Sequence, residues 1–188
     1  EDGAGGRAKV SGVELVKARL AWEEVEAIVL EPVQGGGGYI VPPPKFFDEL
    51  ARIAKRFGML LVFDEVQSGM GRTGKMWAAE HFNASADILA VAKGIASGMP
   101  LSATIARAEV MNWPPGAHAS TFGGNPVACA AGLVTVELLA KERIANADRG
   151  GGYLRDRLRA CAARVRTGGE RWVAATIVRA LRGHRRGG

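Results

Sequence analysis

Residues 60–76 read LLVFDEVQSGMGRTGKM, an apolar run that ends in Asp64 and Glu65 and continues into a glycine-rich stretch. A short apolar run bounded by polar and turn residues is typical of a buried strand. The segment from Gly69 to Lys75 also fits the frame G-x-x-x-x-G-K, which is the frame of a phosphate-binding loop. The stretch therefore has two interpretations. Either the protein is a nucleotide hydrolase, or the carboxylate at the strand end serves another electron-poor ligand.

Other apolar runs predict the rest of a sheet around this strand. Short strands are expected at residues 27–30, 59–63, 88–92 and 101–106. A helix is expected to start near Pro44 and to end at Gly58, because its apolar residues recur at helical spacing and glycine is typical of a helix C-cap. Strands that alternate with helices predict an α/β fold, a mostly parallel sheet flanked by helices.

A long apolar helix is predicted from residue 125 to about 141. Three consecutive glycines at 150–152 predict a break in the helical pattern, which resumes over residues 153–165. Cys129 lies in an alanine-rich run within the first of these helices and is interpreted as a small core residue. The chain shows no internal repeat.

The composition predicts a globular protein, with 188 residues, 47% hydrophobic and 23% charged. Two cysteines are too few for a disulfide framework and fit a cytoplasmic protein. No apolar run reaches the roughly 20 residues that span a bilayer, and the first residues lack a secretory pattern. We therefore expect no membrane partner. The three histidines are scattered without metal-ligand spacing, so no metal site is predicted.

The net charge of +6 is confined to the end of the chain. Residues 161–188 contain seven arginines and one acidic residue, which account for the whole excess. The remainder carries equal numbers of basic and acidic side chains, so the basic character belongs to a tail and not to a binding face. A nucleic-acid-binding tail is the alternative, but no aromatic interleaving or known module favours it, and no nucleic-acid partner is predicted.

Three functional side chains follow three of the predicted strands: Glu31, Asp64 and Lys93. Ligands of open α/β sheets gather at the carboxyl ends of the strands, so these groups are expected to converge. The hydrolase interpretation fits less well, because Met76 stands where a phosphate loop needs Ser or Thr for magnesium. It also asks one strand to supply both the phosphate loop and the separate metal-binding carboxylate.

Pyridoxal phosphate is a ligand that would use a carboxylate and a lysine together. Its chemistry needs a lysine amine that attaches to the cofactor and moves protons at the substrate Cα. It also needs a carboxylate on the pyridine nitrogen, so that the ring stays protonated and accepts electrons. Asp64 and Lys93 are placed to supply these two groups. Taken alone, Lys93 is better interpreted as a solvated loop lysine, and Asp64 as a helix N-cap or turn residue.

Four stretches carry a family resemblance: EPVQGGGGYIVPPPKFF, LLVFDEVQSGMGRTGKMWAAEHF, DILAVAKGIASGMPLSA and STFGGNPVACAAGL. In order and spacing they resemble the class III (omega-amino-acid) aminotransferases, a subgroup of the fold-type I pyridoxal-phosphate enzymes. The pair D-E-V-Q-x-G-x-G-R-T-G and A-K-G is specific to this family. The resemblance covers residues 25–139 and extends more loosely to residue 164. It implies the large, cofactor-binding domain of that fold, in incomplete form.

The resemblance implies roles for four residues near the cofactor ring. Lys93 corresponds to the lysine that forms the Schiff base with pyridoxal 5'-phosphate, and is the implied catalytic residue. Asp64 corresponds to the partner of the pyridine nitrogen. Val66 would pack against one face of the ring, and Gln67 would reach the ring 3-hydroxyl oxygen.

The resemblance also implies a homodimer with active sites at the subunit interface. Thr121, in STFGGNP, matches a threonine that contacts the cofactor phosphate of the neighbouring subunit. Glu31 matches a glutamate that pairs with a substrate-binding arginine and moves aside for the second substrate. The implied reaction transfers an amino group from an amino acid or omega-amino acid to a keto acid in two half-reactions through Lys93.

Two alternatives remain open at this stage. Amino-acid racemases and aminomutases use the same scaffold with the same lysine and aspartate. The chain could also be a non-catalytic partner that keeps only the dimer surface.

The chain is expected to divide into four parts. Residues 1–24 form a connecting segment, 25–145 a partial cofactor domain, 146–166 a helix leading towards a small domain, and 167–188 an atypical Arg/Gly-rich tail. The upstream phosphate-cradling turn of the family and its downstream carboxylate-binding arginine have no counterpart here. We therefore expect a truncated form that is weakly active or inactive.

Overall fold

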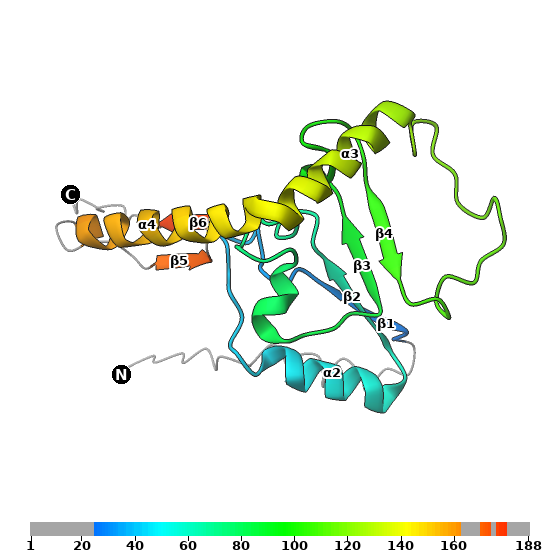
Figure 1. Ribbon diagram of the computed structural model, residues 1–188. Coiled ribbons are helices and arrows are strands. Elements are labelled where there is room, and N and C mark those ends of the chain that lie inside the picture. The colour runs from blue at the N-terminus through cyan, green and yellow to red at the C-terminus, as the bar shows by residue number, and fades with distance from the viewer. Residues whose placement is uncertain (1–24, 163–169, 174–175, 180–188) are drawn as a thin grey trace, which may run out of the picture.

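The computed structural model describes residues 25–162, 170–173 and 176–179 (Figure 1). The main sheet has four strands in spatial order β1-β2-β3-β4. Their bounds are β1 (Ala27–Leu30), β2 (Leu60–Asp64), β3 (Ile88–Val91) and β4 (Ala103–Ala106). The first three are parallel, and β4 runs antiparallel to β3. The predicted α/β class with a mostly parallel sheet is confirmed.

The second strand is shifted by one residue from its predicted bounds of 59–63. Met59 donates its N–H to the carbonyl of Ala54, at a distance of 2.9 Å, and so belongs to the end of the preceding helix. Asp64 pairs in register with Ala90 of β3, which makes the aspartate the last residue of β2. The backbone of Asp64 is therefore fixed by the sheet itself, and the residue does not lie in a loop beyond it.

The helix α2 (Phe46–Phe57) covers one face of the sheet. Phe47 and Leu50 are almost fully buried and pack against Leu61 and Phe63 of β2. The rings of Phe47 and Phe63 meet edge to face, with centroids 5.3 Å apart, a favoured aromatic geometry. Gly58 ends the helix as predicted, with a φ of 67°.

Two short 3-10 helices lie in the connections between strands, and longer helices follow β4. The bounds are η1 (Ala78–Phe82), η2 (Lys93–Ala96), α3 (Pro126–Leu138), the π-helical turn η3 (Leu139–Arg143) and α4 (Ile144–Ala162). Asn125 caps α3 by accepting a hydrogen bond from Ala128 N at 2.9 Å.

The predicted helix break at residues 150–152 is wrong, since α4 runs through all three glycines. Each glycine costs about 1 kcal/mol relative to alanine in a helix, but nucleation costs far more than extension. Because α4 continues from α3 through η3, it needs no nucleus of its own. The glycines therefore weaken this helix without ending it.

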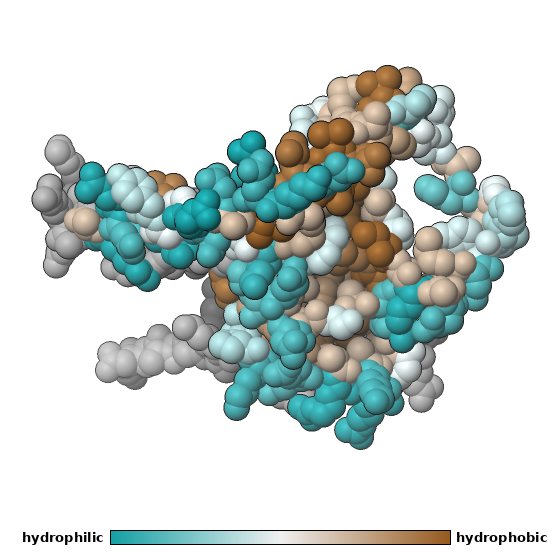
Figure 2. Space-filling model, viewed as in Figure 1, coloured by the Kyte–Doolittle hydropathy of each residue, from teal (hydrophilic) through white to brown (hydrophobic). Residues whose placement is uncertain are grey.

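The outer face of α3 is apolar and exposed. Figure 2 shows a hydrophobic patch over this helix, and four of its exposed apolar side chains are Val127, Leu133, Val134 and Val136. Cys129 is exposed as well, which corrects its interpretation as a core residue. The prediction failed because an apolar sequence predicts burial only where some other element covers the helix.

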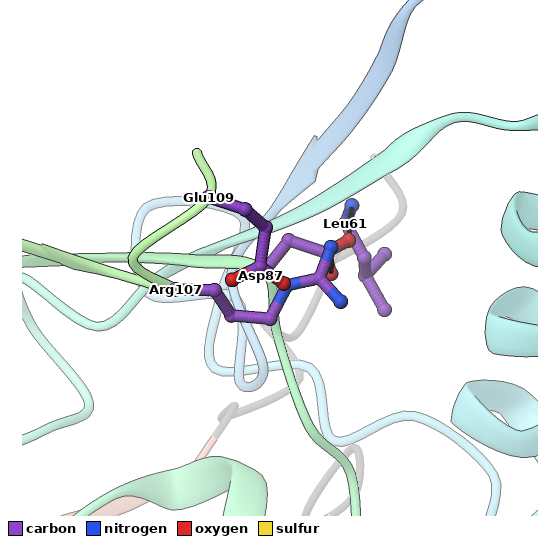
Figure 3. A network of polar contacts seen from close by, with 4 residues as sticks. All are labelled: Leu61, Asp87, Arg107 and Glu109. Atoms are coloured by element: carbon purple, nitrogen blue, oxygen red, sulfur yellow. Dashed lines mark hydrogen bonds and ion pairs between the residues drawn. The ribbon is translucent and has the colours of Figure 1, made fainter. Parts of the chain in front are cut away.

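The amino-terminal edge of the sheet is held by a polar network (Figure 3). Asp87 accepts a hydrogen bond from Leu61 N at 2.7 Å and pairs with the Arg107 guanidinium at 3.0 Å. Arg107 also approaches Glu109 at 3.3 Å. Since these residues come from β2 and from the segments flanking β3 and β4, the network joins three strands at one edge.

An open apolar cavity of about 340 Å³ adjoins this network. Phe63, Leu89 and Ile105 line it from the sheet, and Trp77 lines it from the residue before η1. None of the residues predicted for function lines this cavity. Among the described helices, none combines the length and the hydrophobicity that a bilayer span requires.

Within the region predicted as an Arg/Gly-rich tail, the structure describes two short antiparallel strands, β5 (Glu170–Val173) and β6 (Thr176–Arg179). The predicted connecting segment at residues 1–24 lies outside the described residues.

Candidate active site

Lys93 lies just beyond the carboxyl end of β3, at the first position of η2. Its side chain is exposed, and its backbone takes a left-handed φ of 47°, which is uncommon for a residue other than glycine. The next residue, Gly94, packs against Met70, and a Cβ on Gly94 would lie 3.1 Å from the Met70 Cβ. The loop that presents the lysine is therefore packed against the loop that follows β2.

Asp64 ends the neighbouring parallel strand. Its Oδ1 accepts a hydrogen bond from Val66 N at 3.0 Å, an Asx-type turn that fixes the carboxylate at the strand end. Its Oδ2 has no hydrogen-bond partner among the described residues. Val66 is half-buried next to this carboxylate. The turn-residue interpretation of Asp64 is thus correct for one oxygen and leaves the other available to a ligand.

Gln67, in the turn after β2, contacts Lys93, which follows β3. Its Oε1 accepts a hydrogen bond from Lys93 Nζ at 3.0 Å, and its Nε2 donates to the hydroxyl of Tyr39, also at 3.0 Å. The contact brings together Lys93 and Gln67, which lie 26 residues apart in the sequence. This hydrogen bond brings the loop after β3 to the turn after β2, and the convergence of Asp64 with Lys93 stays a prediction.

Glu31 brings the end of β1 into the same region. Its Oε2 accepts a hydrogen bond from Gly35 N at 2.8 Å. A Cβ on Gly35 would lie 2.5 Å from Gln67 Nε2, so the glycine-rich loop packs directly on the Gln67 amide. Glu31 thus shapes the loop that covers Gln67.

Thr121 is not brought to this cluster within the chain. It is exposed in the long connection between β4 and α3. Within the described residues, no hydrogen bond joins it to Lys93, Asp64 or Gln67. Its predicted action across a subunit interface stays a prediction.

Glu65 is a buried acid that the sequence interpretation left without a role. It is fully buried and accepts hydrogen bonds from Ser68 Oγ at 2.6 Å and from Ala79 N at 2.9 Å. Burial raises the pKa of Glu65 above its ordinary value of 4.5, because desolvation outweighs the hydrogen bonds that favour the charged form. Its carboxylate ties the turn after Asp64 to the start of η1.

The Gly69–Lys75 stretch does not form a phosphate loop. It folds into successive turns, in which Gly71 and Gly74 take left-handed φ values of 80° and 87°. Gly69 is required for close packing, since a Cβ at this position would lie 2.8 Å from the Glu65 carbonyl oxygen. The next element, η1, is one short 3-10 helix of five residues. This geometry favours the irregular-loop interpretation over the nucleotide hydrolase.

The fold agrees with comparisons to known proteins. The family model for class-III aminotransferases matches residues 6–170. The chain belongs to the class-III aminotransferase family. The resemblance that the sequence motifs indicated is confirmed, including the fold of its incomplete cofactor domain.

Solved structures of family members are similar to this chain over most of its length. Ornithine delta-aminotransferase of Plasmodium falciparum is 34% identical with a TM-score of 0.80, over 86% of this chain and 44% of that one. An (S)-enantioselective omega-transaminase from Thermomicrobium roseum is 32% identical with a TM-score of 0.82, over 90% and 40%. A PLP-bound amine transaminase from an uncultivated Pseudomonas species is 32% identical with a TM-score of 0.79, over 86% and 40%. The chain thus spans less than half the length of these relatives.

The sequence interpretation gave no role to two residues that hold the segments around this cluster, Tyr39 and Glu65. The only sequence signal for Glu65 was its place directly after Asp64 at the end of an apolar strand. Tyr39 gave a weaker signal, as the one aromatic hydroxyl in a glycine-rich loop at the strand end.

Proposed function

We propose that this chain provides the cofactor-binding part of a pyridoxal-phosphate-dependent aminotransferase. The enzyme would transfer an amino group from an amino acid or omega-amino acid to a keto acid. The observation that carries the proposal is the Lys93–Gln67 hydrogen bond, formed beside Asp64 at the ends of adjacent parallel strands. Family membership and the similarity to transaminase structures support the same chemistry.

The described groups fit the cofactor by their chemistry. An accessible primary amine, a carboxylate oxygen without a partner among the described residues and an amide lie at one edge of the sheet. When bound, pyridoxal phosphate supplies an aldehyde that exchanges amines and a ring that withdraws electrons from the substrate Cα.

The residues of this chain would each perform a separate task. Lys93 would hold the cofactor and then carry the proton between substrate carbon and cofactor. Asp64 would keep the ring nitrogen protonated through its carboxylate. Gln67 would bind the ring 3-oxygen, Val66 would pack on the ring face, and Glu31 would move aside for the second substrate.

We also propose a homodimer in which Thr121 contacts the cofactor phosphate held by the partner subunit. Its support is the exposed position of Thr121 next to Phe122, a residue that is 78% exposed, and the exposed apolar face of α3. A cytoplasmic location stays a prediction from the cysteine content.

Mixing two inactive variants tests the dimer. Lys93→Ala and Thr121→Ala chains should each bind the cofactor poorly, whereas refolding them together should create hybrid dimers with one intact site. A mixture that binds no more cofactor than the sum of its components would contradict the shared site.

A half-reaction tests the proposed activity. The purified chain is loaded with pyridoxal phosphate and given an amino donor without a keto acid, and the visible absorption spectrum is followed. Because the chain is expected to be weakly active at most, we expect slow and partial conversion of the bound cofactor to its amine form. This conversion should be lost in Lys93→Ala and kept in Lys75→Ala, because Lys75 is an exposed residue of the turn-forming loop. Failure of the wild-type chain to take up the cofactor, or equal conversion in Lys93→Ala, would contradict the proposal.

A further inference from the structure

We propose that Tyr39 is a positioning residue that holds the Gln67 amide in place between Lys93 and the cofactor. The inference rests on the proposed function and adds a residue to its machinery. Tyr39 touches neither Lys93 nor Asp64 in the described hydrogen bonds, so it acts through Gln67 alone.

The first support is the hydrogen-bond chain itself. Lys93 Nζ donates to Gln67 Oε1, and Gln67 Nε2 donates to Tyr39 Oη, both at 3.0 Å. An ammonium can only donate, so it requires the oxygen end of the amide. The nitrogen end then needs an acceptor, and the tyrosine hydroxyl supplies it. Because a hydroxyl both donates and accepts, Tyr39 can hold the amide in either orientation as the group opposite it changes.

The second support is the backbone of Tyr39. Its φ is 53°, in the left-handed region that favours glycine. Backbone hydrogen bonds maintain this conformation: Tyr39 N donates to the carbonyl of Gly35 at 3.2 Å, and the Gln34 and Ile40 backbones pair on either side. A tyrosine kept in a costly conformation beside a candidate site indicates that the side chain is placed for a purpose.

The third support is close packing on the same amide. Gly35 leaves no room for a side chain, since its Cβ would lie 2.5 Å from Gln67 Nε2. Tyr39 is half-buried, so its hydroxyl bond to the amide is partly shielded from water. The loop from Glu31 to Ile40 therefore confines Gln67 Nε2 by close packing at Gly35 and by the hydroxyl of Tyr39.

The test replaces the hydroxyl and nothing else. Tyr39→Phe keeps the ring and removes one hydrogen bond, and Tyr153→Phe makes the same change on the exposed side of α4 as the matched control. Cofactor affinity is measured by visible absorption titration of the purified chain. The side-chain amide of Gln67 is followed by NMR without cofactor, and the unfolding midpoint is measured in parallel.

We expect Tyr39→Phe to weaken cofactor binding roughly two- to tenfold, the loss expected for one hydrogen bond. The Gln67 amide protons should exchange faster with solvent, while the unfolding midpoint stays near that of Tyr153→Phe. In a Gln67→Ala background the Tyr39→Phe change should have no further effect on affinity, because the two residues act in series.

Two results would overturn the inference while leaving the proposed function intact. One is wild-type affinity and amide exchange in Tyr39→Phe. The other is an equal affinity loss with and without Gln67, which would show that Tyr39 acts independently. Failure of the wild-type chain to take up cofactor is a different result, since it would contradict the proposed function and with it any part for Tyr39 in binding.

Discussion

The two ends of the parallel strands, called here the carboxyl edge and the amino edge of the sheet, are built in opposite ways. At the carboxyl edge, strained backbone collects in the loops after β1, β2 and β3. Of the five described non-glycine residues with left-handed φ, four lie in these loops: Tyr39, Met70, Lys93 and Ser97. At the amino edge, Asp87 instead satisfies both a backbone N–H and a guanidinium (Figure 3).

This difference separates stability from function within one domain. Strain and incompletely paired polar groups are retained where a ligand must bind, and other contacts offset their cost. At the amino edge, where no ligand is proposed, both carboxylate oxygens of Asp87 have partners. We therefore expect substitutions at the carboxyl edge to change cofactor binding, and substitutions at the amino edge to change stability alone.

The largest effect should come from Asp64→Asn. The amide can still accept the Val66 N–H and keep the turn, but it loses the charge that would face the ring nitrogen. A hydrogen bond between charged groups is worth about 1.5–3 kcal/mol, so cofactor affinity should fall about ten- to hundredfold. The measurement is a visible titration with pyridoxal phosphate.

Asp148→Asn, an exposed change on α4, serves as the control for Asp64→Asn and should keep wild-type affinity. If Asp64→Asn unfolds the chain at lower denaturant concentration but binds the cofactor normally, the carboxylate is structural and the contrast between edges fails.

Asp87→Ala should show the reverse pattern. It leaves the buried Leu61 N–H without a partner and removes the pair with Arg107, so the free energy of unfolding should fall by about 1–3 kcal/mol. Cofactor affinity should not change. Denaturant unfolding is the measurement, and Glu109→Ala, which removes only an exposed pair, should cost no more than about 0.5 kcal/mol.

Glu65 is an exception to the comparison, because it is a buried acid near the carboxyl edge whose substitution should change stability. Its pKa is raised by burial, so between its ordinary value of 4.5 and its higher folded-state pKa the folded chain binds more protons than the unfolded one. The free energy of unfolding should therefore decrease as pH rises through that window and then level off. In Glu65→Gln this decrease should vanish, whereas Glu26→Gln, an exposed change, should retain it. An unchanged pH dependence of the free energy of unfolding in Glu65→Gln would show that Glu65 does not cause the decrease.

The smallest effect concerns two glycines away from both edges. Gly150 is helical with open space around its Cα, so Gly150→Ala should raise the free energy of unfolding by about 0.5–1 kcal/mol. Gly58 has equally open surroundings but a φ of 67°, so Gly58→Ala should lower the free energy of unfolding by about 1 kcal/mol. Chemical denaturation of both variants decides, and a destabilised Gly150→Ala would contradict the continuous helix.

The sequence predicted the sheet because its strands are short apolar runs with polar ends, a local signal. Asp64 and Lys93 were placed at neighbouring strand ends for the same reason. The contact between Lys93 and Gln67 follows from strand order, which no local pattern encodes. Tyr39 and Glu65 were missed because their roles depend on how loops pack on one another. The break predicted at the three glycines of α4 was wrong because helix continuity depends on the preceding helix as much as on the residues themselves.

The central claim is that Lys93 is the amine that takes up pyridoxal phosphate, and borohydride reduction followed by peptide mass spectrometry tests it most directly. Loaded wild-type chain should carry one reduced cofactor label, on the peptide containing Lys93, and Lys93→Ala should carry none. A label spread over several exposed lysines, or an undiminished label in Lys93→Ala, would contradict the account.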